Sequence, residues 1–480
     1  MPSIKQEMLH GVFWSAIEKY SGIVVSLIVS AVLARLISPE DFGTVAIVTV
    51  IINFFSIFAT MGIFPAIIQR NDLTQKDLDS IFTYSILGGL CLSSLLFCLS
   101  WKIADFYNDG SLVFISQILS VNIFFASLNL VPNALMAKNK RFRQIAQRTL
   151  SLQVFSGIIS IIAAHSGFGI YSLLISPIVT SIGMFLFNIH YYPCHVDFTF
   201  DLSPLKKIFS YSSYQFLFEF INYFSRNADK LIIGKYLNMG ALGYYDKSYR
   251  LMMLPLQNVT SVINPVIQPV LSSLQDDKSE LVKKYNKIIQ CIAAISFPLA
   301  VFLFFAAYEI INIVYGDNWN PAVPVFKILT ISLPLQMILS SSGAIFQTAN
   351  STDLMFFTGI RNTFVTLSGF LIAICVFNTI EAVAWSWDIS LAINFILTYH
   401  TMYRKVFHIR IWSMIRKLSI PLYSALLLCF FLFVQQATFS IDNIYLSLLV
   451  KCLVAFGSMA LSMRFIMHTN FSRLLYFIKS

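Results

Sequence analysis

The chain has 480 residues, of which 12% are charged and 57% hydrophobic, and its mean hydropathy is +0.73. A soluble globular domain carries about 25% charged residues, so this chain has too few polar side chains to cover soluble domains. Aromatic residues make up 15%, which excludes an intrinsically disordered chain. A membrane span takes roughly 20 apolar residues, so the length accommodates on the order of 12 to 16 spans. The composition predicts a polytopic membrane protein.

The net charge of +10 has an ordinary cause in such a protein, because Lys and Arg collect on the cytoplasmic side of the bilayer. We therefore expect no nucleic acid partner. The seven cysteines are odd in number and lie mostly in apolar runs, which is typical of small apolar residues and not of a disulfide framework. The first apolar run carries Glu18 and Lys19 and has no small-residue cleavage site, so we expect a retained first helix and no signal peptide.

Continuous apolar runs bounded by polar clusters predict an all-α bundle of about fourteen transmembrane helices, because barrel strands would alternate over about 10 residues. In chain order, the expected helices cover residues 11–35, 43–68, 80–101, 111–137, 144–164, 168–190, 208–234, 243–270, 288–308, 322–348, 354–377, 380–402, 418–436 and 443–463. Prolines inside or near these runs, among them Pro132 and Pro334, predict kinks or, alternatively, hinges.

The distribution of Lys and Arg predicts the orientation. With the N-terminus inside, most of the 33 Lys and Arg residues fall in cytoplasmic segments, and only Arg35, Lys102 and Lys235 fall in outside loops. This bias predicts that both termini are cytoplasmic, which requires an even number of spans. The basic stretch KNKRFRQIAQR at 138–148 is expected to be part of this orientation signal, with contact to anionic lipid as an additional role.

An internal repeat appears when the chain is compared with itself. Residues 35–69 align with 235–269 without a gap, and Gly43 and Gly243 coincide at a turn, where backbone geometry restricts the choice of residue. The repeat predicts two six-helix lobes of the same orientation, related by an axis along the membrane normal, followed by a final helix pair. The expected organisation is an N-lobe at 1–190, a cytoplasmic linker at 191–207, a C-lobe at 208–403, and the last two helices with a cytoplasmic tail at 404–480.

Charged side chains inside the expected helices are the most informative residues, because one at the bilayer centre costs about 2.5 to 3.5 kcal/mol. The expected helix 208–234 carries Glu219, Arg226, Asp229 and Lys230. At about 100° per residue, Arg226 and Lys230 each lie roughly 20° from Glu219 around the helix axis, so this face must contact protein or water. Arg226 and Asp229, three residues apart, could instead form a structural ion pair.

Other expected helices add charges of both signs. Glu18 and Lys19 lie near the cytoplasmic end of the first helix, where an interfacial pair is the alternative to an interior role. The eighth and twelfth helices contribute Asp246, Lys247, Arg250 and Asp388. Four bases lie within about two turns of helix ends, from which long side chains reach the interface: Lys247, Lys327, Arg361 and Lys451.

Basic residues outnumber acidic ones within the expected helices, so the interior has a net positive charge. Such an interior suits an anionic substrate, and Arg and Lys satisfy diphosphate oxygens through charge-assisted hydrogen bonds. The acidic residues could bind a coupling proton or cation. The chain contains no GxxxxGK motif followed by Ser or Thr, so we expect no ATP hydrolysis and an energy supply from a gradient or a partner.

A cluster of potential metal ligands lies in the connection HYYPCHVD at 190–197. Its spacing matches no standard zinc site. We expect no metal and no cofactor.

Two stretches carry a family resemblance. FWSAIEKYSGIVVSLIVSAVLARLISPEDFGTVAIV at 13–48 and SRNADKLIIGKYLNMGALGYYDKSYRL at 225–251 resemble the Wzx-type polysaccharide flippases, particularly the colanic-acid-exporter-like branch. That branch belongs to the multidrug/oligosaccharidyl-lipid/polysaccharide exporter superfamily, which also contains the MATE drug exporters and the lipid II flippase. Helix number, repeat and orientation extend the resemblance over essentially the whole chain.

The resemblance implies a transporter, not an enzyme, with fourteen helices in two lobes. Such a protein flips an undecaprenyl-diphosphate-linked oligosaccharide across the bacterial inner membrane by alternating access, for capsule, exopolysaccharide or O-antigen assembly. It implies a coupling ion, H⁺ or Na⁺, and a polysaccharide polymerase and export machinery as partners. Carried over by position, the candidates for binding the lipid-linked anion are Lys19, Arg226, Lys230 and Arg250, and those for coupling or charge balance are Glu18, Glu219 and Asp229.

Two other functions compete with this interpretation. An ion-coupled drug exporter of the MATE type is the nearer alternative, although a net cationic interior disfavours cationic drugs. A membrane glycosyltransferase or oligosaccharide polymerase would need a sizeable outer loop for its chemistry, and none of the expected outside connections exceeds about 15 residues.

Overall fold

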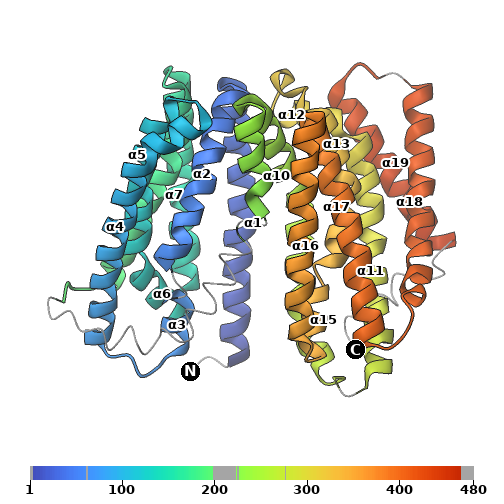
Figure 1. Ribbon diagram of the computed structural model, residues 1–480, viewed down its shortest axis with the longest axis horizontal. Coiled ribbons are helices and arrows are strands. Elements are labelled where there is room, and N and C mark those ends of the chain that lie inside the picture. The colour runs from blue at the N-terminus through green and yellow to red at the C-terminus, as the bar shows by residue number, and fades with distance from the viewer. Residues whose placement is uncertain are drawn as a thin grey trace. The chain divides into compact units, whose positions relative to one another are not determined.

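The structure is a computed structural model that describes residues 4–60, 63–197, 223, 226–275, 277–439 and 441–465. Every regular element in these ranges is a helix, so the predicted all-α class is confirmed. The chain divides into two compact units, Met1–Gly243 and Tyr244–Ser480. Helices within each unit run alongside one another (Figure 1). The lobe and linker boundaries expected at residues 190, 207 and 403 stay a prediction.

The first unit is built from eight labelled α-helices, a 3₁₀ turn and a further helical stretch. These are α1 (Ile4–Leu36), α2 (Pro39–Thr60), α3 (Ile63–Gln69), α4 (Gln75–Tyr107), α5 (Ser111–Leu128), α6 (Leu130–Lys138), α7 (Phe142–His165), η1 (Gly169–Tyr171), α8 (Ser172–Tyr191) and residues 226–236.

The second unit contains most of α10 (Met239–Ser272), which begins at the end of the first. The other elements are α11 (Lys278–Phe305), α12 (Ala307–Val314), η2 (Asp317–Trp319), α13 (Ala322–Ile331), α14 (Leu333–Leu339), α15 (Ser342–Thr348), α16 (Thr352–Ile372), η3 (Ala373–Phe377), α17 (Ile380–Thr401), η4 (Met402–Val406), α18 (Trp412–Thr438) and α19 (Ile444–Phe465).

Eleven helices of the described residues are long and apolar enough to cross a membrane, or twelve if one bent pair is counted as a span. The chain is therefore a multi-pass membrane protein, as its composition predicts. The bent pair, α13 with 333–348, corresponds to the expected tenth helix. The eighth expected helix is present as α10 but is not among the eleven helices that meet these criteria. The seventh expected helix, 208–234, lies largely outside the described residues. The count of fourteen stays a prediction.

The fourth expected helix of each half is interrupted shortly before a proline. In the first unit, α5 ends at Leu128 and α6 begins at Leu130, two residues before Pro132. In the second, α13 ends at Ile331 and α14 begins with Leu333 and Pro334. Proline lacks the N–H that would continue the helical hydrogen bonds, so a break just before it is expected. The continuous runs expected at 111–137 and 322–348 are thus kinked.

Small residues allow α1 and α7 to pack closely in parallel. A Cβ at Gly11 would lie 3.1 Å from the Phe142 ring, and one at Gly22 would lie 3.1 Å from Gln153 Oε1. Residues 11 and 22 therefore face 142 and 153 with the same offset along the two helices. Close packing of this kind is the main attractive term between helices in lipid.

The two glycines aligned by the repeat contact each other's helices. A Cβ at Gly43 would lie 1.7 Å from the Met239 carbonyl oxygen, and one at Gly243 would lie 1.9 Å from the Pro39 carbonyl oxygen. The contact is reciprocal because each glycine meets the first residue of the other helix. Only glycine permits this approach of α2 to the start of α10.

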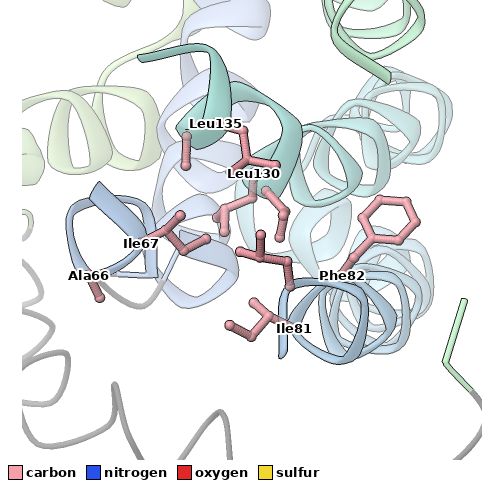
Figure 2. Packing of buried hydrophobic residues seen from close by; sticks show 9 residues of the cluster. Ala66, Ile67, Ile81, Phe82, Leu130 and Leu135 are labelled. Atoms are coloured by element: carbon pink, nitrogen blue, oxygen red, sulfur yellow. The ribbon is translucent and has the colours of Figure 1, made fainter. Parts of the chain in front are cut away.

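A hydrophobic cluster fixes the short helix α3 at one end of the first unit (Figure 2). Ala66 and Ile67 of α3 pack against Ile81 and Phe82 of α4 and against α6, whose cluster members are Leu130, Val131, Ala134 and Leu135. The Lys138 ammonium donates hydrogen bonds to the carbonyl oxygens of Ile67 and Arg70, which lie at the C-terminal end of α3. This satisfies carbonyls that the helix leaves unpaired.

Candidate functional site

The charges of the expected seventh helix are only partly described. Arg226 is exposed, Lys230 is half-buried, and Asp229 is buried at 1% exposure. The Lys230 backbone N–H donates a hydrogen bond of 2.8 Å to Asp229 Oδ1. Glu219 lies outside the described residues. Arg226 and Asp229 therefore differ sharply in exposure.

The end of this helix is anchored on the first unit. Gly234 faces Ile47 of α2, where an added Cβ would lie 2.5 Å from Ile47 Cδ1. The Lys235 ammonium donates a hydrogen bond to the Phe106 carbonyl oxygen at the end of α4 and lies 4.5 Å from the centre of the Phe106 ring. These contacts fix the position of residues 226–236 relative to α2 and α4.

The two charges of α1 face different surroundings. Glu18 Oε1 accepts a 2.9 Å hydrogen bond from the Thr149 hydroxyl of α7, in register with the glycine contacts of these two helices. Lys19 is exposed, and its ammonium lies 5.8 Å from the centre of the Tyr20 ring. Glu18 is thus held against α7, and only Lys19 of the pair is directed outward.

A buried arginine lies next to Thr149 and was not among the predicted site residues. Arg148 is 5% exposed, and its Nη1 donates hydrogen bonds to the side-chain oxygens of Asn133 and Asn188. Asn188 Nδ2 in turn donates to Asn129 Oδ1 at 2.7 Å, beside the break between α5 and α6. We call Arg148, Asn129, Asn133 and Asn188 the arginine–amide cluster. It joins α5, α6, α7 and α8.

Several bases of 138–148 also have partners within the fold, and the role of this stretch as an orientation signal stays a prediction. Lys138 is bound to carbonyls of α3 and its flank, Arg143 lies 5.6 Å from the Trp14 ring, and Arg148 is buried. The sequence contained a signal for this role, because Arg148 lies within an expected helix, and a guanidinium buried there needs polar partners. The asparagines in otherwise apolar helices are those partners.

The part of α10 that begins the second unit carries Asp246, Lys247 and Arg250 within two turns. Arg250 Nε and Asp246 Oδ2 form an i,i+4 ion pair at 2.8 Å, so the predicted anion-binding residue Arg250 already has an acidic partner. Its side chain is nevertheless 56% exposed. Lys247 is only 4% exposed, and its ammonium lies 5.4 Å from the centre of the Tyr315 ring.

Two bases expected to reach the interface are buried instead. Lys247 is one of them, and Lys451 of α19 is the other, with 4% exposure. Lys451 Nζ lies 2.5 Å from Glu309 Oε1 of α12 and donates a 2.7 Å hydrogen bond to the Phe305 carbonyl oxygen. The Ser447 hydroxyl also donates to Glu309 Oε1, at 2.6 Å. The expectation for Lys451 was wrong because its acidic partner lies on a helix distant in sequence.

Polar residues line the contact between α16 and α17. Asn394 Nδ2 donates to Thr366 Oγ1 at 3.0 Å, and Asn362 Nδ2 donates to Thr398 Oγ1 at 3.0 Å. Asp388 on α17 is 7% exposed, and neither of its carboxyl oxygens has a hydrogen-bond partner in the described part of the chain. A buried carboxyl group without hydrogen-bond partners costs stability.

The connection after α8 binds the start of α4. The His195 backbone N–H donates to Asp79 Oδ1 at 3.0 Å, and the Ser80 hydroxyl donates to Asp197 Oδ2 at 2.6 Å. Burial, together with the negative charge of Asp79, raises the pKa of the Cys194 thiol to about 12. These residues hold the chain across α4, and the described residues contain no group of three or more His, Cys, Asp or Glu placed to hold a metal.

The described site residues have chemistry suited to anions more than to covalent reactions. Lys19, Arg226 and Lys230 lie in the first unit and Arg250 in the second. Each supplies N–H donors of the type that bind phosphate oxygens, and Arg226 and Lys19 are exposed. Basic groups inside membrane helices are either held by structural partners, as Arg148 and Lys451 are, or are candidates for the pathway of a charged substrate.

Comparisons with known proteins agree with this fold. Residues 32–324 match the family described as polysaccharide biosynthesis protein. The chain is 26% identical over 406 residues to the teichuronic acid biosynthesis protein TuaB of Bacillus subtilis, covering 83% of this chain and 82% of TuaB. It is 24% identical over 430 residues to the lipopolysaccharide biosynthesis protein WzxC of Escherichia coli, covering 88% and 86%. The solved lipid II flippase MurJ, in an inward closed conformation, has a TM-score of 0.72 at 17% identity, covering 94% of this chain and 98% of MurJ.

Proposed function

The chain belongs to the polysaccharide biosynthesis protein family, and from this membership we propose that it is a flippase for a lipid-linked oligosaccharide. The substrate in this proposal is an undecaprenyl-diphosphate-linked repeat unit for capsule, exopolysaccharide or O-antigen assembly. The protein moves it across the membrane by alternating access and catalyses no covalent reaction. The observation that carries the proposal is the family match over residues 32–324 of a chain built from membrane-spanning helices.

In this proposal, the diphosphate is bound by Lys19, Arg226, Lys230 and Arg250. Guanidinium and ammonium groups bind diphosphate oxygens by charge-assisted hydrogen bonds, which are the stronger class of hydrogen bond. The exposure of Arg226 and Lys19, and the 56% exposure of the Arg250 side chain, support access by a ligand. The ion pair with Asp246 restrains Arg250 in one direction without burying it.

The acidic residues have different places in the proposal. Glu18 accepts a hydrogen bond from the Thr149 hydroxyl, and Thr149 follows the buried Arg148 on α7. In the proposal, Glu18 balances the charge of the Arg148 guanidinium. Asp229 and Glu219 remain the proposed coupling residues for H⁺ or Na⁺, and the burial of Asp229 supports this assignment because a buried carboxylate gains most from a bound cation.

We further propose that the protein resides in the bacterial inner membrane with both termini in the cytoplasm. The excess of Lys and Arg on one side of the expected spans supports this orientation. A polysaccharide polymerase and the export machinery are the proposed protein partners, since they would consume the flipped repeat unit.

Transport in proteoliposomes tests the proposal. Full-length protein is reconstituted with a fluorescent undecaprenyl-diphosphate-linked oligosaccharide, and a membrane-impermeant quencher reports its movement. We expect the protein to accelerate movement, an ion gradient to accelerate it further, and Arg226→Ala or Lys230→Ala to reduce it about 10-fold or more, as for loss of a charged contact.

Lys102→Ala is the matched control, because Lys102 is an exposed base at the far end of α4 and has no place in the proposed site. It should transport as the unchanged protein does. No acceleration by the intact protein would refute the flippase function. Transport of a lipophilic cation in place of the oligosaccharide would instead favour the drug exporter.

A further inference from the structure

The connection between α17 and α18, together with the first turns of α18, carries a dense group of basic residues. Both helices are long and apolar enough to span, so the residues that join them lie at a membrane surface. The stretch 389–441 contains no Asp or Glu. We call its five Lys and Arg residues the basic connection: Arg404, Lys405, Arg410, Arg416 and Lys417.

Buried side chains hold the underside of this connection in place. The Tyr403 hydroxyl donates a hydrogen bond to Asn286 Oδ1 of α11, and the Phe407 ring packs edge-on against Tyr403 with 5.5 Å between ring centres. Val406 and Met414 are also buried. The buried side chains hold the backbone of this segment against the protein, so the exposed basic side chains project outward from a fixed backbone.

All five side chains of the basic connection are exposed. None of them makes an ion pair within 4.0 Å in the part of the chain that the structure describes. The basic stretch at 138–148 differs, since Lys138 binds carbonyl oxygens, Arg143 lies over Trp14 and Arg148 is buried. The basic connection therefore retains its charge for an external partner.

Exposed apolar side chains accompany these bases. Trp412 is 68% exposed, and Ile409 and Ile415 are 38% and 40% exposed. Tryptophan is enriched where hydrocarbon meets head groups, because its ring is apolar and its N–H is polar. These apolar side chains next to the basic connection are complementary to a membrane surface, in which negatively charged head groups lie above the acyl chains.

We propose that the basic connection binds the phosphate head groups of anionic phospholipids in the leaflet it faces. Arg404, Lys405, Arg410, Arg416 and Lys417 bind the phosphates, while Trp412 and Ile415 enter the upper acyl region. Lysine and arginine near an anionic membrane surface each contribute about 1 kcal/mol of attraction, so five act strongly together. This inference is independent of the transport function, because lipid binding requires no movement of substrate.

Lipid titration of the purified full-length protein tests the proposal. The protein in neutral detergent is titrated with phosphatidylglycerol or with phosphatidylcholine of the same acyl chains, and bound lipid is counted by native mass spectrometry. We expect preferential binding of phosphatidylglycerol that weakens in high salt. The combined change Arg410→Gln, Arg416→Gln and Lys417→Gln should weaken phosphatidylglycerol binding at least about tenfold and leave phosphatidylcholine binding unchanged.

Two controls make the test specific. Lys102→Gln removes an exposed base that also adjoins an exposed tryptophan, Trp101, and should leave the preference intact. Arg410→Lys with Arg416→Lys keeps the charge and should bind within about threefold of the unchanged protein. If the triple variant does not fold, the lipid preference, its salt dependence and these two variants still decide the outcome.

Three results would overturn the proposal. Equal binding of both lipids by the unchanged protein would remove the charge selectivity. An unaltered preference in the folded triple variant would place the lipid elsewhere. Displacement of phosphatidylglycerol by an equal concentration of inorganic diphosphate would assign the basic connection to a substrate head group and not to bilayer lipid.

Discussion

The two compact units hold charge inside the membrane by different means. In the first, the Arg148 guanidinium is bound by the amide oxygens of Asn133 and Asn188, and no carboxylate of the described residues lies within 4.0 Å of it. In the second, Lys451 is paired with Glu309 at 2.5 Å. Amide oxygens accept hydrogen bonds from the guanidinium without cancelling its charge, and Glu18 acts on Arg148 only through the Coulombic interaction. A carboxylate in direct contact, as in the Lys451–Glu309 pair, both accepts the hydrogen bond and cancels the charge.

This difference teaches how much each group depends on its partner. Each charge of a buried ion pair has lost its hydration, so removing one partner leaves the other buried without compensation. Removing the Arg148 guanidinium leaves the amide oxygens of Asn133 and Asn188 without a donor, while Glu18 keeps its hydrogen bond from the Thr149 hydroxyl. The same substitution of a buried base should therefore cost more in the second unit than in the first.

Breaking the pair of the second unit should have the largest effect. Lys451→Met leaves Glu309 buried and unpaired, and we expect a loss of about 3–5 kcal/mol in the free energy of unfolding. Unfolding of the detergent-solubilised protein measures it. Adding Glu309→Gln to Lys451→Met should restore most of the loss, and a double variant no more stable than the single one would contradict the pairing.

Removing the cation of the first unit should cost less. Arg148→Met leaves the oxygens of Asn133 and Asn188 without a donor, and we expect a loss of about 1–3 kcal/mol by the same unfolding measurement. Arg148→Lys, which keeps the charge but offers fewer donors, should fall between the two. A loss equal to that of Lys451→Met would erase the distinction between the units.

Neutralising the isolated acid of the second unit should have little effect on stability. Asp388→Asn keeps the shape of a side chain whose carboxyl oxygens have no hydrogen-bond partner among the described residues, so we expect a change within about 1 kcal/mol, or a gain. Glu309→Gln in the otherwise unchanged protein is the contrast and should destabilise clearly. Equal losses in the two variants would show that Asp388 is as firmly paired as Glu309.

Outside the spanning helices the units differ again: Asp79 lies near the Cys194 thiol in the first, whereas the basic connection of the second contains no acidic residue. Burial and Asp79 raise the pKa of Cys194 to about 12, so its thiol stays protonated at neutral pH and becomes a thiolate only as the pH approaches that value. Alkylation at pH 8, followed by mass spectrometry, should be about a hundredfold or more slower than for a free thiol.

Asp79→Asn tests the electrostatic part of this shift. Losing the negative charge should lower the pKa of Cys194 and accelerate alkylation at pH 8, although burial keeps it slow. An unchanged rate would leave burial as the sole cause.

The helical fold was largely predictable because apolar runs are local. Helix ends were less so: the run expected at 288–308 is α11, Lys278–Phe305, which begins with a polar segment that hydropathy alone does not include. A helix can continue past the apolar run into a polar segment, where its start is set by a capping residue. Asp277 is the N-cap of α11, and its side chain accepts a hydrogen bond from the Glu280 backbone N–H.

The candidate site was less predictable because its partners are distant in sequence. Lys451 and Glu309 are separated by 142 residues, and a lysine near a helix end looks the same in sequence whether it reaches water or an acid. Arg148 was counted with its basic neighbours, since only the meeting of α6 and α8 brings Asn133 and Asn188 to it. Glu18 was a candidate from its place in the first apolar run, but its contact with Thr149 could not be predicted without the register of α1 on α7.

The crossing of Gly43 and Gly243 has a consequence for how this sequence can vary. Each glycine leaves room for the backbone of the helix that holds the other, so an alanine at either position displaces the same contact. The losses from Gly43→Ala and Gly243→Ala should then be strongly non-additive, because the second alanine enters a contact that the first has already opened. Thermodynamically, two positions in different halves of the chain behave as a single site.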